Sequence, residues 1–135
     1  MDDTYSRAVA GGLEIRAKAD ALELSSVRHQ VREFVEQAGG GSGLAADLEL
    51  VVSELATNVI EHTRSPTLTV SVSRSDGDWV VDVADVGDLS ILDRVELPDL
   101  DEPAGRGLFV VSSIVDDIAI VEAGDAYAIR CRVGA

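Results

Sequence analysis

Glu54 and Asn58 are the residues of this sequence whose types and spacing best suit chemistry. They stand four positions apart in SGLAADLELVVSELATNVIEHT, residues 42–63, where apolar side chains recur at the three- and four-residue steps typical of a helix. At roughly 100° per residue, a carboxylate and a carboxamide at this spacing lie about 40° apart and face one place. A carboxylate can accept a proton, and an amide oxygen is a hard, neutral ligand of the kind that Mg²⁺ takes. Spacing alone is weak evidence, because two half-exposed polar residues give the same pattern.

A third candidate, Asp85, stands at the end of a predicted strand. Trp79, Val81 and Val83 share one face of that strand, and a further step of two places Asp85 on the same covered face. A buried carboxylate must accept hydrogen bonds, so its partners are either nearby backbone amides or a ligand. Gly87 follows and permits a tight turn beside it.

The stretch Gly105-Arg106-Gly107-Leu108 opens an apolar segment with helical spacing. The free backbone amides at a helix start can hold a phosphate group. Because a glycine-rich turn before a helix is common, this stretch taken alone favours an ordinary turn over a phosphate site.

These residues must be positioned by alternating helical and strand-like segments. The segments are a strand at 13–19, a helix at about 23–38, a helix at 42–63, a hairpin at 67–73 and 79–83, a helix from about 107, and a hairpin at 118–121 and 127–133. The alternation leaves one wet face, which favours a sheet covered on one side. The predicted fold class is an α/β (α+β) two-layer sandwich, a mixed, mainly antiparallel sheet with helices packed on one face.

The domain organisation follows from the same pass along the chain. Residues 1–12 are expected to be a flexible N-terminal leader, and residues 13–135 a single domain. Within that domain, residues 88–104 hold six carboxylates and two prolines without a clear period, which indicates an acidic loop or lid.

The charge balance limits the partners. The 135 residues include 11 Lys and Arg against 25 Asp and Glu, a formal net charge of −14, so we expect no direct nucleic-acid binding and a basic protein partner. The N-terminus lacks the regions of a signal peptide and no apolar run is long enough for a membrane span, so we expect a cytoplasmic protein with no membrane partner. The lone Cys131 cannot form an internal disulfide and is expected to be a small buried residue.

The three motifs stand in a fixed order: Glu54-x-x-x-Asn58, then Asp85-Val86-Gly87, then Gly105-Arg106-Gly107-Leu108. Together they resemble the GHKL, or Bergerat, ATP-binding fold shared by gyrase, MutL, a major heat-shock chaperone and sensor histidine kinases. Within that superfamily the chain most resembles the RsbW- and SpoIIAB-like anti-sigma factor serine kinases of bacteria, over roughly residues 13–133.

The resemblance implies a catalytic and metal-binding edge. Asn58 matches the asparagine that holds Mg²⁺. Glu54 matches the glutamate that acts as a base, or orients the attacking group, during phosphoryl transfer. The implied cofactors are ATP or ADP and Mg²⁺.

The resemblance also implies a nucleotide pocket. Asp85 matches the aspartate that accepts a hydrogen bond from the adenine amino group, and Gly87 belongs to the same glycine box. The second glycine box corresponds to Gly105 and Gly107, whose amides and helix start, with Arg106 and Leu108, border the nucleotide.

The implied function is that of an ATP-dependent protein serine kinase. Such a protein sequesters a sigma factor and phosphorylates a serine on a STAS-type anti-sigma factor antagonist, and it forms a homodimer. Gly87 is followed by Asp88-Leu89-Ser90, where the first glycine box usually has a further glycine, which puts the nucleotide pocket and the kinase activity in question.

Two other functions compete with this one. The first is a catalytically silent partner-binding module of the same fold. The second is the catalytic half of a histidine kinase, which ranks low because His29 lacks the acidic neighbour of a typical phosphoacceptor and no paired helix accompanies it. His62, two turns from Glu54, is interpreted as a packed or hydrogen-bonded core residue, with a role in the pocket as the less favoured alternative.

Overall fold

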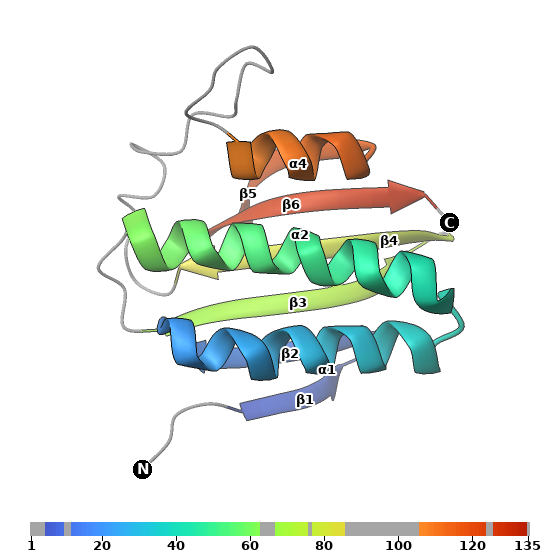
Figure 1. Cartoon of the computed structure of the whole chain (residues 1–135), viewed down its shortest axis with the longest axis horizontal. Coiled ribbons are helices and arrows are strands. Elements are labelled where there is room, and N and C mark those ends of the chain that lie inside the picture. The colour runs from blue at the N-terminus through green and yellow to red at the C-terminus, as the bar shows by residue number, and fades with distance from the viewer. Residues whose placement is uncertain are drawn as a thin grey trace.

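The computed structural model describes residues 5–9, 12–62, 67–75, 77–85, 106–123 and 126–134. The elements are β1 Tyr5–Val9, β2 Gly12–Lys18, a 3-10 turn at Ala21–Glu23, α1 Leu24–Gln37, α2 Gly41–His62, β3 Thr67–Ser75, β4 Asp78–Asp85, α4 Arg106–Ile114, β5 Asp117–Ala123 and β6 Ala126–Gly134. Figure 1 follows them from the N-terminus to the C-terminus. No helix among these residues is long and apolar enough to cross a membrane.

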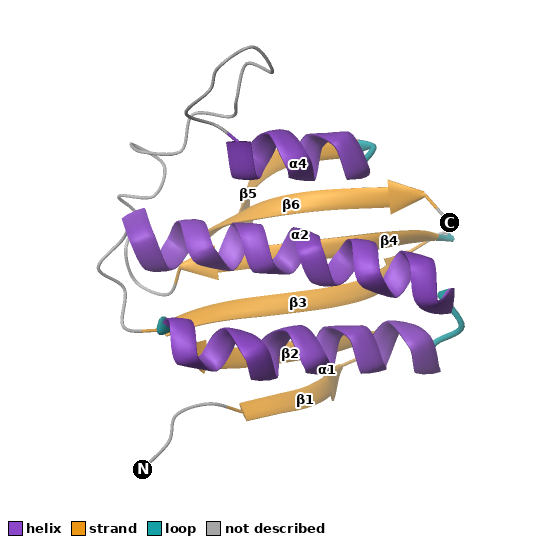
Figure 2. Ribbon diagram, viewed as in Figure 1, coloured by secondary structure: helices purple, strands orange, loops and turns teal. Residues whose placement is uncertain are grey.

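The strands form one sheet in the order β1-β2-β3-β4-β6-β5. Figure 2 shows α1, α2 and α4 over one face of this sheet, with α2 in contact with both other helices. This arrangement confirms the predicted two-layer sandwich. Every described pairing is antiparallel, although the prediction allowed a mixed sheet. The strands β4 and β5, joined through α4, run in the same direction but do not pair because β6 lies between them.

One core lies between the helices and the sheet. The inward strand positions are buried, as their alternation predicts: Ile15, Ala17, Val70, Val72, Trp79, Val81, Val83, Ile129 and Cys131. The apolar stripe of α2 is buried against them, with Leu48, Val51, Val52, Leu55 and Val59 each exposed by 1% or less. Because this stripe is fully covered, the rotation of α2 about its axis is fixed, and so are the positions of its polar residues.

The sequence predicted a flexible leader at residues 1–12, and strand β1 corrects that expectation for residues 5–9. Tyr5–Val9 pairs antiparallel with β2, from Tyr5 opposite Arg16 to Val9 opposite Gly12. A five-residue segment gives too short an alternation to be recognised alone, and the unpaired edge of β2 supplies the partner that makes it a strand. The acidic segment 88–104 lies outside the described residues.

The uncovered face of the sheet carries ion pairs across β4 and β6. Arg130 donates two hydrogen bonds to Asp82, from Nε to Oδ1 and from Nη2 to Oδ2, each at 2.8 Å. The hydrogen bond to Asp82 raises the pKa of Arg130, against the smaller opposing effect of burial. Arg132 makes a longer contact, 3.5 Å, with Asp78. These pairs let the solvent-facing side of the central strands remain polar.

Candidate nucleotide and phosphoryl-transfer site

Helix α2 places Glu54 and Asn58 on the border that faces α4. The opposite border faces α1, because Arg28 of α1 donates a hydrogen bond to Ser53 at 3.4 Å. At roughly 100° per residue, Glu54 lies about 100° and Asn58 about 140° around the helix axis from Ser53. They therefore flank the buried apolar stripe of α2 on the side opposite to Ser53. Both side chains are half-buried, and α2 contacts α4 on this side. The two candidate residues therefore share one helix border, as their spacing predicts.

Asp85 is the last residue of β4, with its backbone opposite Leu68 of β3. Strand parity places it on the face that carries the fully buried Trp79, Val81 and Val83, which is the face covered by the helices. The structure describes the backbone of Asp85 but not its side chain. It supports the predicted position at the strand end, and the hydrogen-bond partner of the carboxylate remains a prediction.

The second glycine motif begins a helix, as its pattern predicts. Arg106, Gly107 and Leu108 form the first residues of α4, although their side chains are not described. Gly105 and Gly87 lie outside the described residues. Figure 1 shows the start of α4, the end of β4 and the last turns of α2 at the same end of the molecule.

The fold thus brings three chain segments to one end of the two-layer sandwich. They are the end of α2 with its carboxylate and amide, the end of the strand with Asp85, and a helix start with free backbone amides. An anionic ligand at this end would meet the positive end of the α4 dipole. The Asn58 amide is a suitable hard ligand for Mg²⁺, which takes its remaining ligands from water and phosphate.

Two other side chains singled out in the sequence are Cys131 and His62. Cys131 is buried, as predicted, and burial together with the charges of Asp82 and Asp117 raises the pKa of its thiol to about 12. It is therefore not a nucleophile near neutral pH. His62 ends α2, but its side chain is outside the described ones, so its predicted core role stays a prediction.

A groove on the α1 side of α2 was not predicted from the sequence. Arg28, His29 and Arg32 line one wall, and Glu49, Leu50 and Ser53 line the other. From the sequence, Arg28 and Arg32 are expected only to cover the solvent-facing side of the helix. Each helix carries two polar residues four positions apart, Arg28 and Arg32 in α1 and Glu49 and Ser53 in α2. The sequence does not show that these two pairs face each other, because that depends on the antiparallel packing of the helices.

Residues 15–131 match the family of histidine kinase-like ATPase domains. The RsbU and RsbW domains of Rv1364c from Mycobacterium tuberculosis share the fold with a TM-score of 0.68, at 21% identity over 95% of this chain. The SiaB-SiaC complex from Pseudomonas aeruginosa gives a TM-score of 0.63, at 13% identity over 89% of this chain. This chain spans 33% of the first structure's chain and 88% of the second's. No curated protein sequence matches it.

The family match covers the helix with Glu54 and Asn58, the end of β4 and the start of α4. The chain belongs to the histidine kinase-like ATPase domain family. An ATPase domain of this kind binds a nucleotide, which agrees with the predicted chemistry at this end of the sandwich.

Proposed function

We propose that this chain binds Mg·ATP, sequesters a sigma factor, and phosphorylates a serine on a STAS-type anti-sigma factor antagonist. The observation that carries the proposal is the shared border of Glu54 and Asn58 on α2, facing α4 at the end where β4 stops and α4 starts. The family match supports the nucleotide, and the fold likeness to an RsbW domain supports the class of partners.

Each residue has a role in this proposal that suits its chemistry. Asn58 holds Mg²⁺, which neutralises phosphate charge within a chain of net charge −14. Asp85 accepts a hydrogen bond from the adenine amino group. The amides of Gly105 and Gly107, with Arg106 and Leu108, border the phosphates, and Gly87 allows the turn after Asp85.

Glu54 is the proposed base for the serine hydroxyl. Phosphoryl transfer depends mainly on alignment and charge neutralisation, so one carboxylate a helical turn from the metal ligand is enough to take the proton. Mg²⁺, when bound, supplies the electrostatic stabilisation of the transferring group. We place the protein in the cytoplasm and expect it to form a homodimer. Light scattering that shows a strict monomer at high concentration would refute the homodimer.

The pocket is tested by calorimetry with Mg·ATP and Mg·ADP. Asp85→Asn replaces a charge-assisted hydrogen bond of about 1.5–3 kcal/mol, so we expect affinity to fall by on the order of 10- to 100-fold. Asp82→Asn is the matched control, because Asp82 is on the same strand but on the uncovered face. Unchanged affinity in Asp85→Asn, or no binding by the unsubstituted protein at millimolar nucleotide, would show that the pocket is assigned wrongly.

The second candidate function is a catalytically silent partner-binding module. The observation that favours it is the sequence Asp88-Leu89-Ser90 after Gly87, which departs from the usual first glycine box. In that case the chain binds a sigma factor with the same fold but transfers no phosphate to any antagonist.

A further inference from the structure

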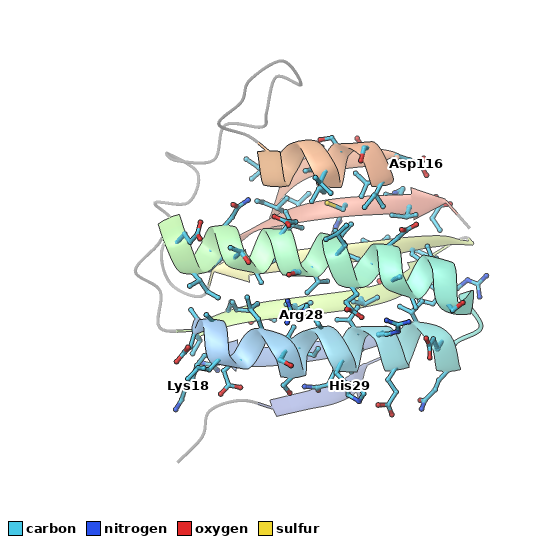
Figure 3. All side chains as sticks on the ribbon, viewed as in Figure 1. Lys18, Arg28, His29 and Asp116 are labelled. Atoms are coloured by element: carbon cyan, nitrogen blue, oxygen red, sulfur yellow. The ribbon has the colours of Figure 1, made fainter. Side chains whose placement is uncertain are left out.

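Glu61, in the last turn of α2, lies in line with Glu54 along the helix. It follows Glu54 by seven positions and Asn58 by three, so at roughly 100° per residue it lies about 20° from Glu54 and about 60° from Asn58 around the helix axis. Arg28 of α1, labelled in Figure 3, contacts the other side of α2 through Ser53 at 3.4 Å. Glu61 therefore extends the row of polar side chains that the candidate site uses.

Asn58 has a carboxylate one helical turn away in each direction along α2. Glu54 precedes it by four positions and Glu61 follows it by three. These are the two spacings at which side chains of a helix are neighbours, with Cβ atoms about 5–6 Å apart. Glu54 and Asn58 are half-buried, whereas Glu61 is exposed. The amide assigned to Mg²⁺ thus lies between two carboxylates, one of which is open to solvent.

The described part of the chain supplies no partner for these three side chains. No hydrogen bond or ion pair from it reaches the side chain of Glu54, Asn58 or Glu61. The carboxylates of α1 differ, because Glu33 and Glu36 each contact a basic side chain one turn away. A half-buried carboxamide without a partner gives up hydrogen bonds to water that the fold does not replace. The free amide of Asn58 therefore suits a ligand from outside the chain.

The chain cannot provide a complete set of metal ligands at this place. Among the residues that the structure describes, no group of three His, Cys, Asp or Glu could hold a metal ion. Asn58 can therefore hold Mg²⁺ only together with nucleotide phosphates and water, which are its usual ligands. Water molecules bound to a metal donate hydrogen bonds to nearby acceptors that orient them. A carboxylate one turn from Asn58 is such an acceptor.

The charge of Glu61 acts differently on a metal ion and on a phosphate group. Two carboxylates beside Asn58 attract a divalent cation, and they repel a phosphate group that carries no metal. Solvent screens the exposed carboxylate of Glu61 in part. Nucleotide affinity at this end of the molecule should therefore depend on the metal, and the loss of Glu61 should weaken only the binding of metal-loaded nucleotide.

We propose that Glu61 is a metal-positioning residue, whose carboxylate accepts hydrogen bonds from water molecules bound to the Mg²⁺ of Mg·ADP or Mg·ATP. This inference rests on the proposed function, because it requires the nucleotide at Asn58. Glu54 keeps its carboxylate for the serine hydroxyl, and Glu61 orients the hydrated metal. Acceptors of this kind typically contribute about 10- to 100-fold to metal affinity, and the solvent exposure of Glu61 favours the lower value.

The test is calorimetry with ADP in the presence of Mg²⁺ and in the presence of EDTA, which requires no phosphoryl transfer. Glu61→Gln should lower the affinity for Mg·ADP about tenfold and leave the affinity for metal-free ADP unchanged or higher. Asp47→Asn is the matched control, because Asp47 is an exposed carboxylate in line with Glu54 but two turns before it, and it should change neither affinity. An unchanged Mg·ADP affinity in Glu61→Gln, or an equal loss with and without Mg²⁺, would overturn the proposal.

Mn²⁺ in place of Mg²⁺ gives a direct measure of metal affinity. The electron paramagnetic resonance signal of free Mn²⁺ is followed as the metal is added to the protein with saturating ADP. Mn²⁺ affinity should fall about tenfold in Glu61→Gln and change by no more than a few-fold in Glu54→Gln. Circular dichroism verifies that each variant is folded. Equal Mn²⁺ affinity in Glu61→Gln and Asp47→Asn, or a larger loss in Glu54→Gln than in Glu61→Gln, would refute the role of Glu61.

Failure of this proposal and failure of the proposed function are separable. If the unsubstituted chain binds no Mg·ADP at millimolar concentration, both are wrong. If it binds Mg·ADP and Asp85→Asn weakens that binding, while Glu61→Gln binds normally, only the role of Glu61 is wrong and the nucleotide site stands.

Discussion

Gly40, in the connector between α1 and α2, is the residue whose substitution most clearly tests how α2 is positioned. Its N–H donates to Val35 O at 2.9 Å. A Cβ built on Gly40 would lie 2.5 Å from Val35 Cγ1 and 3.2 Å from Cζ2 of Trp79. Both Val35 and Trp79 are fully buried, and the Trp79 ring is held edge-on by Phe34 with centroids 6.3 Å apart. Neither neighbour can move aside into solvent.

We therefore expect Gly40→Ala to be destabilising. Forcing an extra methyl group into a packed core typically costs about 1–3 kcal/mol. For a domain of this size each kcal/mol corresponds to a fall in Tm of roughly 4 °C. Gly43→Ala is the matched control, because Gly43 is an exposed residue of α2 and its added Cβ meets nothing within 4 Å. That change should stabilise the protein by about 0.5–1 kcal/mol, since alanine favours the helix.

The assay is urea unfolding followed by the fluorescence of Trp79, the sole tryptophan of the chain, and by circular dichroism. The two substitutions should shift the midpoint in opposite directions. Val35→Ala removes the atom nearest the added methyl group. The double variant Val35→Ala with Gly40→Ala should therefore lose less free energy of unfolding than the two single variants lose in sum. A Gly40→Ala protein as stable as the original, or two glycine variants that shift in the same direction, would refute this account of the connector.

Two further predictions concern stability and pH. The pKa of the Cys131 thiol is raised from 9.0 to about 12 by burial, so the folded protein keeps a proton that the unfolded chain loses. The free energy of unfolding should then fall between pH 9 and 12 by up to about 1.4 kcal/mol per pH unit. Cys131→Ala should remove this contribution when the free energy is measured by urea unfolding across that range. The same pH dependence in the original protein and in Cys131→Ala would contradict the assignment. Asp82→Asn removes the carboxylate charge and one of the two oxygens that accept 2.8 Å hydrogen bonds from Arg130, and it should cost about 1 kcal/mol. Asp78→Asn, at 3.5 Å from Arg132, should cost less than about 0.5 kcal/mol. Thermal melts compare the stability of the two variants. An equal loss of stability in both would show that the length of the ion pair does not determine its contribution.

Helical periodicity predicted α1 and α2 well, because burial of one stripe determines both a helix and its orientation. The predicted range 42–63 is Gly41–His62 in the structure, and the predicted range 23–38 is Leu24–Gln37. The connector between these two helices is rich in glycine, and Gly39 and Gly41 take φ values of 88° and 78° that favour glycine. Strand parity likewise predicted the buried faces of β3, β4 and β6.

What the sequence could not predict depends on contacts between distant segments. Strand β1 exists because the edge of β2 is available to it, and nothing within Tyr5–Val9 reveals that edge. The α1–α2 groove needs the antiparallel register that sets Arg28 against Ser53, which lie 25 positions apart. The three motifs of the candidate site could be recognised in the sequence, because each motif is local. That they lie at the same end of the molecule depends on how the helices pack on the sheet, which the sequence does not show.

The most direct test of the proposed function is phosphoryl transfer from radiolabelled ATP to STAS-type antagonist proteins by the unsubstituted chain and by Glu54→Gln. Glutamine keeps the size of the side chain but cannot accept the serine proton, so Mg·ATP affinity should change by no more than a few-fold while transfer falls by on the order of 10²–10⁴. Asp47→Asn, an exposed carboxylate two turns earlier on α2, is the control and should transfer normally. Equal transfer by the original chain and Glu54→Gln would contradict the catalytic role. No transfer by the original chain, with a sigma factor still bound, would favour the silent binding module.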